Sequence, residues 1–120
     1  MPLHHQAASA VAWGDEAHVR TNRDRYREKF SQVMPILAPV LEFAEPQGAF
    51  YLWPRTPLDD ETFARRLYAE AGVATLPGSY LGRDGLRGNP GRNRLRLALV
   101  AELDDCVEAA LRIRDFSAAL

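Results

Sequence analysis

The sequence predicts an α+β fold in which helices cover one face of a small β-sheet, and three observations lead to this prediction. Four segments carry apolar residues at helical spacing, three shorter segments are typical of strands, and the two kinds alternate irregularly along the chain. With 120 residues, of which 47% are hydrophobic and 26% charged, the composition is that of one globular domain with its own core. We therefore expect a single two-layer domain over residues 1–120.

Two helices are predicted at the N-terminus. The first covers Leu3 to Trp13, and Gly14 followed by Asp15 is typical of a helix end and a new N-cap. The second extends to about Leu37, because apolar residues recur at steps of seven, four, three and four. Its other face mixes arginines and Lys29 with acidic residues, which predicts a solvated surface and places Lys29 on it.

The middle of the chain predicts a strand, a helix and a second strand. "GAFYLWP" (48–54) is an aromatic, strand-like run. "TPLDDETFARRLYAEAG" begins with an acidic first turn and ends on Gly72, as helices commonly do. "VATLPGSYLG" (73–82) predicts a short strand broken by Pro77 and Gly78, and a loop rich in Gly and Arg follows over 82–92.

The last predicted strand, "NRLRLALV" (93–100), alternates apolar and other residues before a final amphipathic helix, "AELDDCVEAALRIRDF". Leu95, Leu97 and Leu99 share one face, and Arg94 and Arg96 share the other. A guanidinium group offers paired donors that match a carboxylate, and a strand holds such a group more rigidly than a loop does. Alternation makes the two arginines equivalent, so water and an anion both remain possible partners for each.

Composition argues against several classes of function. The 15 basic and 16 acidic residues leave a net charge of −1, so no overall field attracts nucleic acid or an anionic membrane. No run is long enough to span a bilayer and no secretion signal is present, so we expect a cytoplasmic protein. The lone cysteine, Cys106, lies among apolar helix positions and is predicted to be a small core residue.

No metal site is expected either. His4 and His5 are adjacent, so on a helix they point roughly 100° apart and do not easily share an ion. The arginines of the 82–92 loop have no aromatic neighbours for stacking bases, which favours a solvated loop. A stand-alone α+β module that binds a small anion without catalysis remains an alternative.

Three motifs in a fixed order carry a family resemblance: "PQGAFYLWP" (46–54), "AGVATLPGSYLG" (71–82) and "NRLRLALV", followed by the final helix. Together they resemble the C-terminal part of class I/II, fold-type I pyridoxal-phosphate aminotransferases, over about residues 2–118. Within that family the resemblance is greatest to bacterial succinyldiaminopimelate aminotransferases of lysine and diaminopimelate biosynthesis. The resemblance implies that residues 1–120 are the small C-terminal domain of such an enzyme together with the helix that precedes it. It also implies that the complete enzyme is a homodimer.

The resemblance also implies an activity and two substrate-binding residues. Members of the family transfer an amino group between glutamate and a keto acid, here N-succinyl-2-amino-6-ketopimelate. A strand arginine followed by an aliphatic and a small residue holds the substrate α-carboxylate, and Arg96 stands at that position, which leaves Arg94 in solvent. In the family's Pro-Gly turn, Leu81 stands where many members have Phe, so Tyr80 is carried over as a residue lining the substrate entrance.

The same resemblance implies a cofactor that this chain is not equipped to hold. Such enzymes bind pyridoxal 5′-phosphate through a lysine Schiff base and a phosphate-binding cup. The only lysine is Lys29, and no family motif surrounds it. We therefore expect the large cofactor-binding domain to be absent, assign no catalytic or cofactor-binding residue, and expect the chain alone to be inactive.

Overall fold

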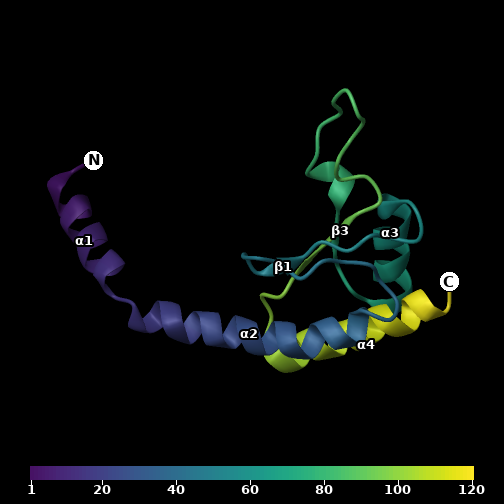
Figure 1. Cartoon of the computed structure of the whole chain (residues 1–120), viewed down its shortest axis with the longest axis horizontal. Helices are drawn as coiled ribbons and strands as arrows, with labels where there is room; N and C mark the ends of the chain where they lie inside the picture. Colours follow the sequence, from purple (N-terminus) through teal and green to yellow (C-terminus); the bar gives the residue numbers. More distant parts are fainter.

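The computed structural model describes all residues from 1 to 120 and has two layers, helices and a small sheet. Figure 1 shows α2 and α4 side by side beneath the sheet, with α3 at one end of it and α1 extending away from the body. This arrangement confirms the α+β prediction. The elements in order are α1 (Leu3–Gly14), α2 (Ala17–Leu37), β1 (Tyr51–Leu52), α3 (Asp60–Ala71), β2 (Leu76–Pro77), the 3-10 helix η1 (Gly78–Tyr80), β3 (Leu95–Ala98) and α4 (Leu103–Ala118).

The sheet is antiparallel in the order β1-β3-β2, so β3 is its central strand. Tyr51 pairs with Ala98 on one side of β3, and Leu76 pairs with Arg96 on the other. The strands are shorter than the predicted segments 48–54, 73–82 and 93–100 for local reasons. Ala49 has a left-handed φ of +67° that turns the chain before β1, and the 3-10 helix η1 begins directly after β2.

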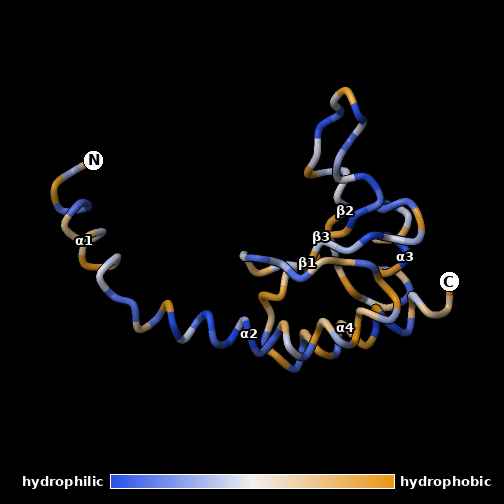
Figure 2. Tube along the Cα trace, in the orientation of Figure 1, coloured by the Kyte–Doolittle hydropathy of each residue, from blue (hydrophilic) through white to orange (hydrophobic).

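The core lies between the sheet and the helices. Leu95, Leu97 and Leu99 are all buried, as the alternation predicts. Phe63 of α3 meets Phe116 of α4 edge to face, with ring centroids 5.3 Å apart. Figure 2 shows hydropathy alternating along α2 and α4, the pattern by which amphipathic helices bury one side. The other face of β3 is left without a helical cover.

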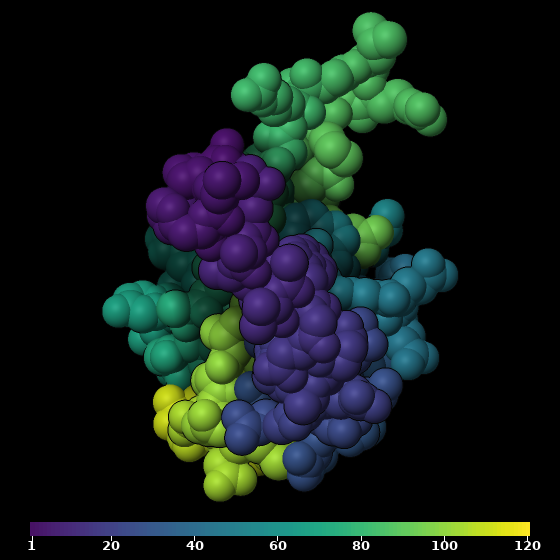
Figure 3. Space-filling model, turned by 90° about the vertical axis from the view of Figure 1, so that its left-hand side faces the viewer, coloured from purple at the N-terminus to yellow at the C-terminus, as the bar shows by residue number.

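The N-terminal helix α1 does not pack against the core, and none of its residues is buried. Leu3, Val11 and Trp13 are 82%, 76% and 84% exposed, so its apolar residues face solvent. Figure 3, viewed from the N-terminal side, shows α1 and the start of α2 in front of the rest of the chain, and Figure 1 shows that this segment extends away from the body. None of the helices combines the length and apolar character that crossing a bilayer requires.

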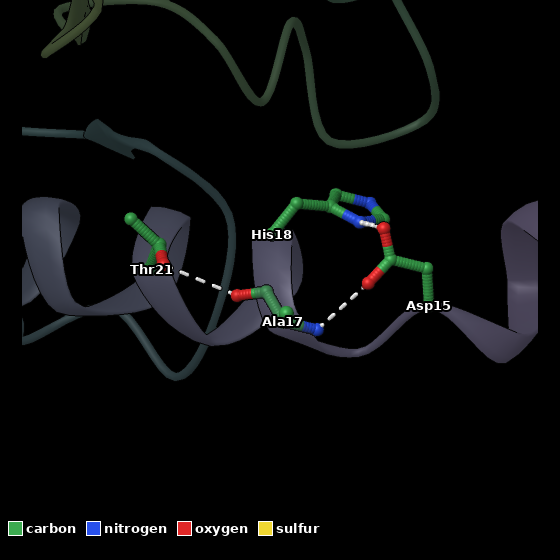
Figure 4. A network of polar contacts seen from close by, with 4 residues as sticks. All are labelled: Asp15, Ala17, His18 and Thr21. Atoms are coloured by element: carbon green, nitrogen blue, oxygen red, sulfur yellow. Dashed lines mark hydrogen bonds and ion pairs between the residues drawn. The ribbon is translucent and has the colours of Figure 1, made fainter.

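The junction between α1 and α2 is held by Asp15, one residue before the N-cap position that Glu16 occupies. The Asp15 carboxylate accepts a hydrogen bond from the Ala17 amide at 3.0 Å and pairs with His18 Nδ1 at 3.1 Å (Figure 4). The hydrogen bond from His18 is the main cause that lowers the pKa of Asp15. Asp15, the predicted N-cap, thus does accept a hydrogen bond from the backbone at the start of α2. The helix itself begins at Ala17, slightly later than expected, and Glu16 occupies the N-cap position.

The prediction for Cys106 is confirmed, and the prediction for Lys29 is wrong. Burial raises the pKa of the Cys106 thiol, which is 6% exposed and donates to the carbonyl of Ala101 at 3.4 Å. Lys29 is half-buried, because its long stem carries Nζ to the carbonyl of Leu99 at 3.1 Å and to 5.1 Å from the Tyr26 ring centroid. It links α2 to the end of the β3 segment.

Candidate functional site

The candidate site is the side of the sheet that faces away from the helices. Because Leu95 and Leu97 point inward, Arg96 and Ala98 point outward. Their register partners Leu76 and Tyr51 share that side. We call these four residues the open face.

Arg96 is the charged group of the open face, and its guanidinium has no hydrogen-bond or ion-pair partner within the chain. The side chain is half-buried, and its Cζ lies 5.3 Å from the centroid of the Tyr51 ring. None of the ion pairs in the structure includes Arg96, and its guanidinium donates no hydrogen bond within the chain. The ring therefore orients the group from one side while its five N–H donors remain unused.

Arg94 differs from Arg96, although alternation makes the two equivalent. Its Nη1 donates to the carbonyl of Trp53 at 3.2 Å, and its own carbonyl accepts from the amide of Gly78 at 2.8 Å. Arg94 is half-buried and bridges the segments on both sides of β3. The expectation that it lies in solvent is therefore wrong, because neighbouring segments provide acceptors that the strand pattern does not show.

The Pro-Gly turn lies directly against the chain that enters β3. A Cβ on Gly78 would be 2.3 Å from the Gly91 carbonyl oxygen, so a glycine is required at this contact. Asn89 adds a second link, since its Nδ2 donates to the carbonyl of Ser79 at 2.9 Å. The turn and the start of β3 therefore form one packed unit.

Tyr80 lies at the edge of this unit. It is 64% exposed, and its hydroxyl donates to Glu61 Oε2 on α3 at 3.1 Å. That hydrogen bond is the largest of the contributions that raise the pKa of Tyr80. The two predicted residues therefore have different contacts: the Arg96 guanidinium lies over the Tyr51 ring, whereas the Tyr80 hydroxyl is bound to Glu61 on α3. Its role at a substrate entrance stays a prediction.

Sequence reasoning missed two residues of this region. Tyr51 could have been found, because alternation within "GAFYLWP" places it opposite the buried Leu52. Nothing in the sequence indicates that Asp60 is buried, since acidic residues are common in the first turn of a helix. It is nevertheless 1% exposed, and it accepts hydrogen bonds from the amides of Ser79 at 2.8 Å and Asn93 at 3.1 Å.

Other polar clusters offer no comparable site. No group of three or more His, Cys, Asp or Glu side chains that could hold a metal ion is present. The ring centroids of His4 and His5 lie 4.3 Å apart on the exposed helix α1, and no third ligand joins them. The arginines of the 82–92 loop are exposed, in agreement with a solvated loop.

The chain was compared with protein families and with known proteins, and both comparisons match aminotransferases. The family model for class I and II aminotransferases matches residues 1–111. Transaminase BacF of Bacillus subtilis is 30% identical over 114 residues, which cover 91% of this chain and 27% of that protein. The match thus includes both the open face and most of the helices beneath it.

Solved structures give the same result. An aminotransferase from Neisseria meningitidis has a TM-score of 0.90 and 45% identity over 97% of this chain and 30% of its own. The probable N-succinyldiaminopimelate aminotransferase from Thermus thermophilus has a TM-score of 0.69 and 36% identity, over 84% of this chain and 26% of its own. The chain therefore spans between a quarter and a third of the length of these relatives.

Proposed function

The chain belongs to the class I and II aminotransferase family, and from this premise we propose that it is the C-terminal, substrate-carboxylate-binding part of a transaminase. In the complete enzyme, Arg96 would hold the α-carboxylate of glutamate and then of the keto acid that receives the amino group. The complete enzyme would be a cytoplasmic homodimer. The chain alone would bind substrate weakly and transfer nothing.

One observation carries this proposal: Arg94, directly before β3, and Arg96, within it, have different polar contacts. Arg94 is bound to the carbonyl of Trp53, whereas Arg96 has no acceptor within the chain. A half-buried guanidinium with free donors is a strong site for a planar carboxylate, because two parallel N–H bonds match its two oxygens. The Tyr51 ring restricts the guanidinium and lowers the entropy that binding would cost.

The residues of this chain do not fit the cofactor of the family. Pyridoxal phosphate supplies the electron sink for amino-group transfer and needs a free lysine amine to hold it. The Lys29 amine is instead bound to the carbonyl of Leu99 and lies beside the Tyr26 ring. We therefore propose that residues of this chain bind the substrate carboxylate and that residues outside 1–120 hold the cofactor.

We propose N-succinyl-2-amino-6-ketopimelate as the keto acid that accepts the amino group. Support comes from the resemblance of the three motifs to succinyldiaminopimelate aminotransferases and from the likeness to the Thermus thermophilus structure. The free Arg96 would bind the α-carboxylate common to this keto acid and to glutamate, and the rest of the pocket would select the side chain.

A chimera tests the role of Arg96. Residues 2–118 would replace the corresponding segment of the Neisseria meningitidis aminotransferase, which the chain matches over 97% of its length. In this enzyme we expect Arg96→Lys to lower kcat/KM for glutamate roughly a hundredfold, about 3 kcal/mol, because an ammonium does not reproduce the paired donors. Arg94→Lys is the matched control and should change kcat/KM much less.

Equal kcat/KM values for the two lysine variants would refute the assignment of Arg96. A parallel test uses the 120-residue chain incubated with pyridoxal phosphate and glutamate. We expect no visible absorbance band that shifts on adding glutamate, and such a band would refute the predicted inactivity. Micromolar affinity of the isolated chain for a dicarboxylate would instead support a stand-alone anion-binding module.

A further inference from the structure

Asp60 is a buried carboxylate without a cationic partner. It is 1% exposed and belongs to none of the ion pairs in the structure. A buried charge needs compensation, and here two backbone amides provide it, Ser79 at 2.8 Å and Asn93 at 3.1 Å. The separate oxygens Oδ2 and Oδ1 accept these two hydrogen bonds.

Capping of α3 does not account for this arrangement. The N-cap is the neighbouring Asp59, whose carboxylate accepts from the Thr62 amide at 3.1 Å. Asp60 instead reaches residues 19 and 33 positions later in the chain. Its hydrogen bonds therefore connect α3 to the two ends of the loop that precedes β3.

Both ends of that loop lead to site residues. Ser79 lies in η1, between the close-packed Gly78 and Tyr80. Asn93 has a left-handed φ of +57° and stands three residues before Arg96. A left-handed residue at this point sets the direction in which β3 begins, and the hydrogen bond from its amide helps to hold it there.

We infer that Asp60 is a positioning residue for the carboxylate site, which it serves by fixing the backbone at Ser79 and Asn93 and thereby the course of β3 through Arg96. This inference rests on the proposed function of Arg96. In this role Asp60 does not itself touch the substrate.

The charge state of Asp60 agrees with this role. Burial raises the pKa of its carboxyl, but the hydrogen bonds from Ser79 and from the Asn93 amide outweigh burial and leave the pKa below its ordinary value. The group is therefore ionised at neutral pH, and both oxygens can accept.

The test compares two adjacent aspartates. Asp60→Asn keeps the shape but replaces one oxygen with an NH2 group that cannot accept, so one of the two amides loses its partner. Asp59→Ala is the matched control, because it weakens the same helix without touching Ser79 or Asn93.

In the chimera described above, we expect Asp60→Asn to raise KM for glutamate about tenfold with little change in kcat, because a displaced Arg96 weakens ground-state carboxylate binding. Asp59→Ala should leave KM within about twofold, although it lowers stability. Equal KM values for Asp60→Asn and the unsubstituted chimera would overturn the positioning role, as would an equal rise in Asp59→Ala.

Amide hydrogen exchange in the unsubstituted 120-residue chain provides a measurement that needs no variant. We expect the amides of Ser79 and Asn93 to exchange at least about a hundredfold more slowly than that of the fully exposed Leu86. Exchange at the Leu86 rate would overturn the inference even if Asp60→Asn failed to fold.

The two proposals fail differently. If Arg96→Lys leaves the chimera fully active, the proposed function is wrong, and slow exchange at Ser79 would then show only a structural link. If Arg96→Lys is impaired but Asp60→Asn is not, the proposed function stands and the positioning role is wrong.

Discussion

A methyl group added at Gly91 should separate the Pro-Gly turn from the chain that enters β3. A Cβ at this position would lie 1.9 Å from the carbonyl oxygen of Gly78 and 2.4 Å from its carbonyl carbon. Ordinary van der Waals contact begins at 3.4 Å, so the shorter distance falls 1.5 Å below it. Both obstructing atoms belong to backbone, so no side-chain rotation can relieve the clash.

The loss of stability expected for Gly91→Ala depends on how far the backbone segments at Gly78 and Gly91 must separate. Separating the two segments also stretches the hydrogen bond from the Gly78 amide to the Arg94 carbonyl, which measures 2.8 Å. Overpacking of this kind typically costs 1–3 kcal/mol and a hydrogen bond adds about 1 kcal/mol, so we expect a loss of roughly 2–4 kcal/mol.

Urea unfolding of the 120-residue chain measures this loss. Gly85→Ala is the matched control, because a Cβ there meets nothing within 4 Å and the residue has no left-handed φ. We expect Gly85→Ala to change the free energy of unfolding by less than about 0.5 kcal/mol. If Gly91→Ala were equally mild, the close approach of Gly78 and Gly91 would not exist in solution.

Two further predictions concern the first turn of α3. Asp59→Ala should lower the free energy of unfolding by about 1 kcal/mol, because the carboxylate accepts from the amide and hydroxyl of Thr62; Asp59→Asn, which still caps, should lose only a few tenths. Because the pKa of Asp60 is lowered from 3.8, its charge stabilises the fold above that pH, and the stabilisation is lost as pH falls through the lower folded value. The stability gap between the unsubstituted chain and Asp60→Asn should therefore narrow in acid denaturation below about pH 4. A gap of constant size from about pH 6 to about pH 2 would contradict this reasoning.

Most of the fold could be predicted because helices and alternating strands leave periodic signals in a sequence. The helix over Asp60–Ala71 was predicted from its acidic start and Gly72 end, and Gly72 does adopt the left-handed C-cap conformation. Strand lengths were less predictable. Alternation cannot show where a strand stops pairing, which here depends on the left-handed φ of Ala49 and on the 3-10 helix after Pro77.

The order of residues alone was enough to place Leu95, Leu97 and Leu99 toward the core, because side chains of a strand alternate with a period of two. That same period left Arg94 and Arg96 indistinguishable. Folding separated them, since the carbonyl of Trp53 and the ring of Tyr51 come from a segment more than 40 residues earlier. The contacts of Lys29 and Asp60 likewise depend on the folded chain, because their hydrogen-bond partners are backbone groups that any sequence would possess.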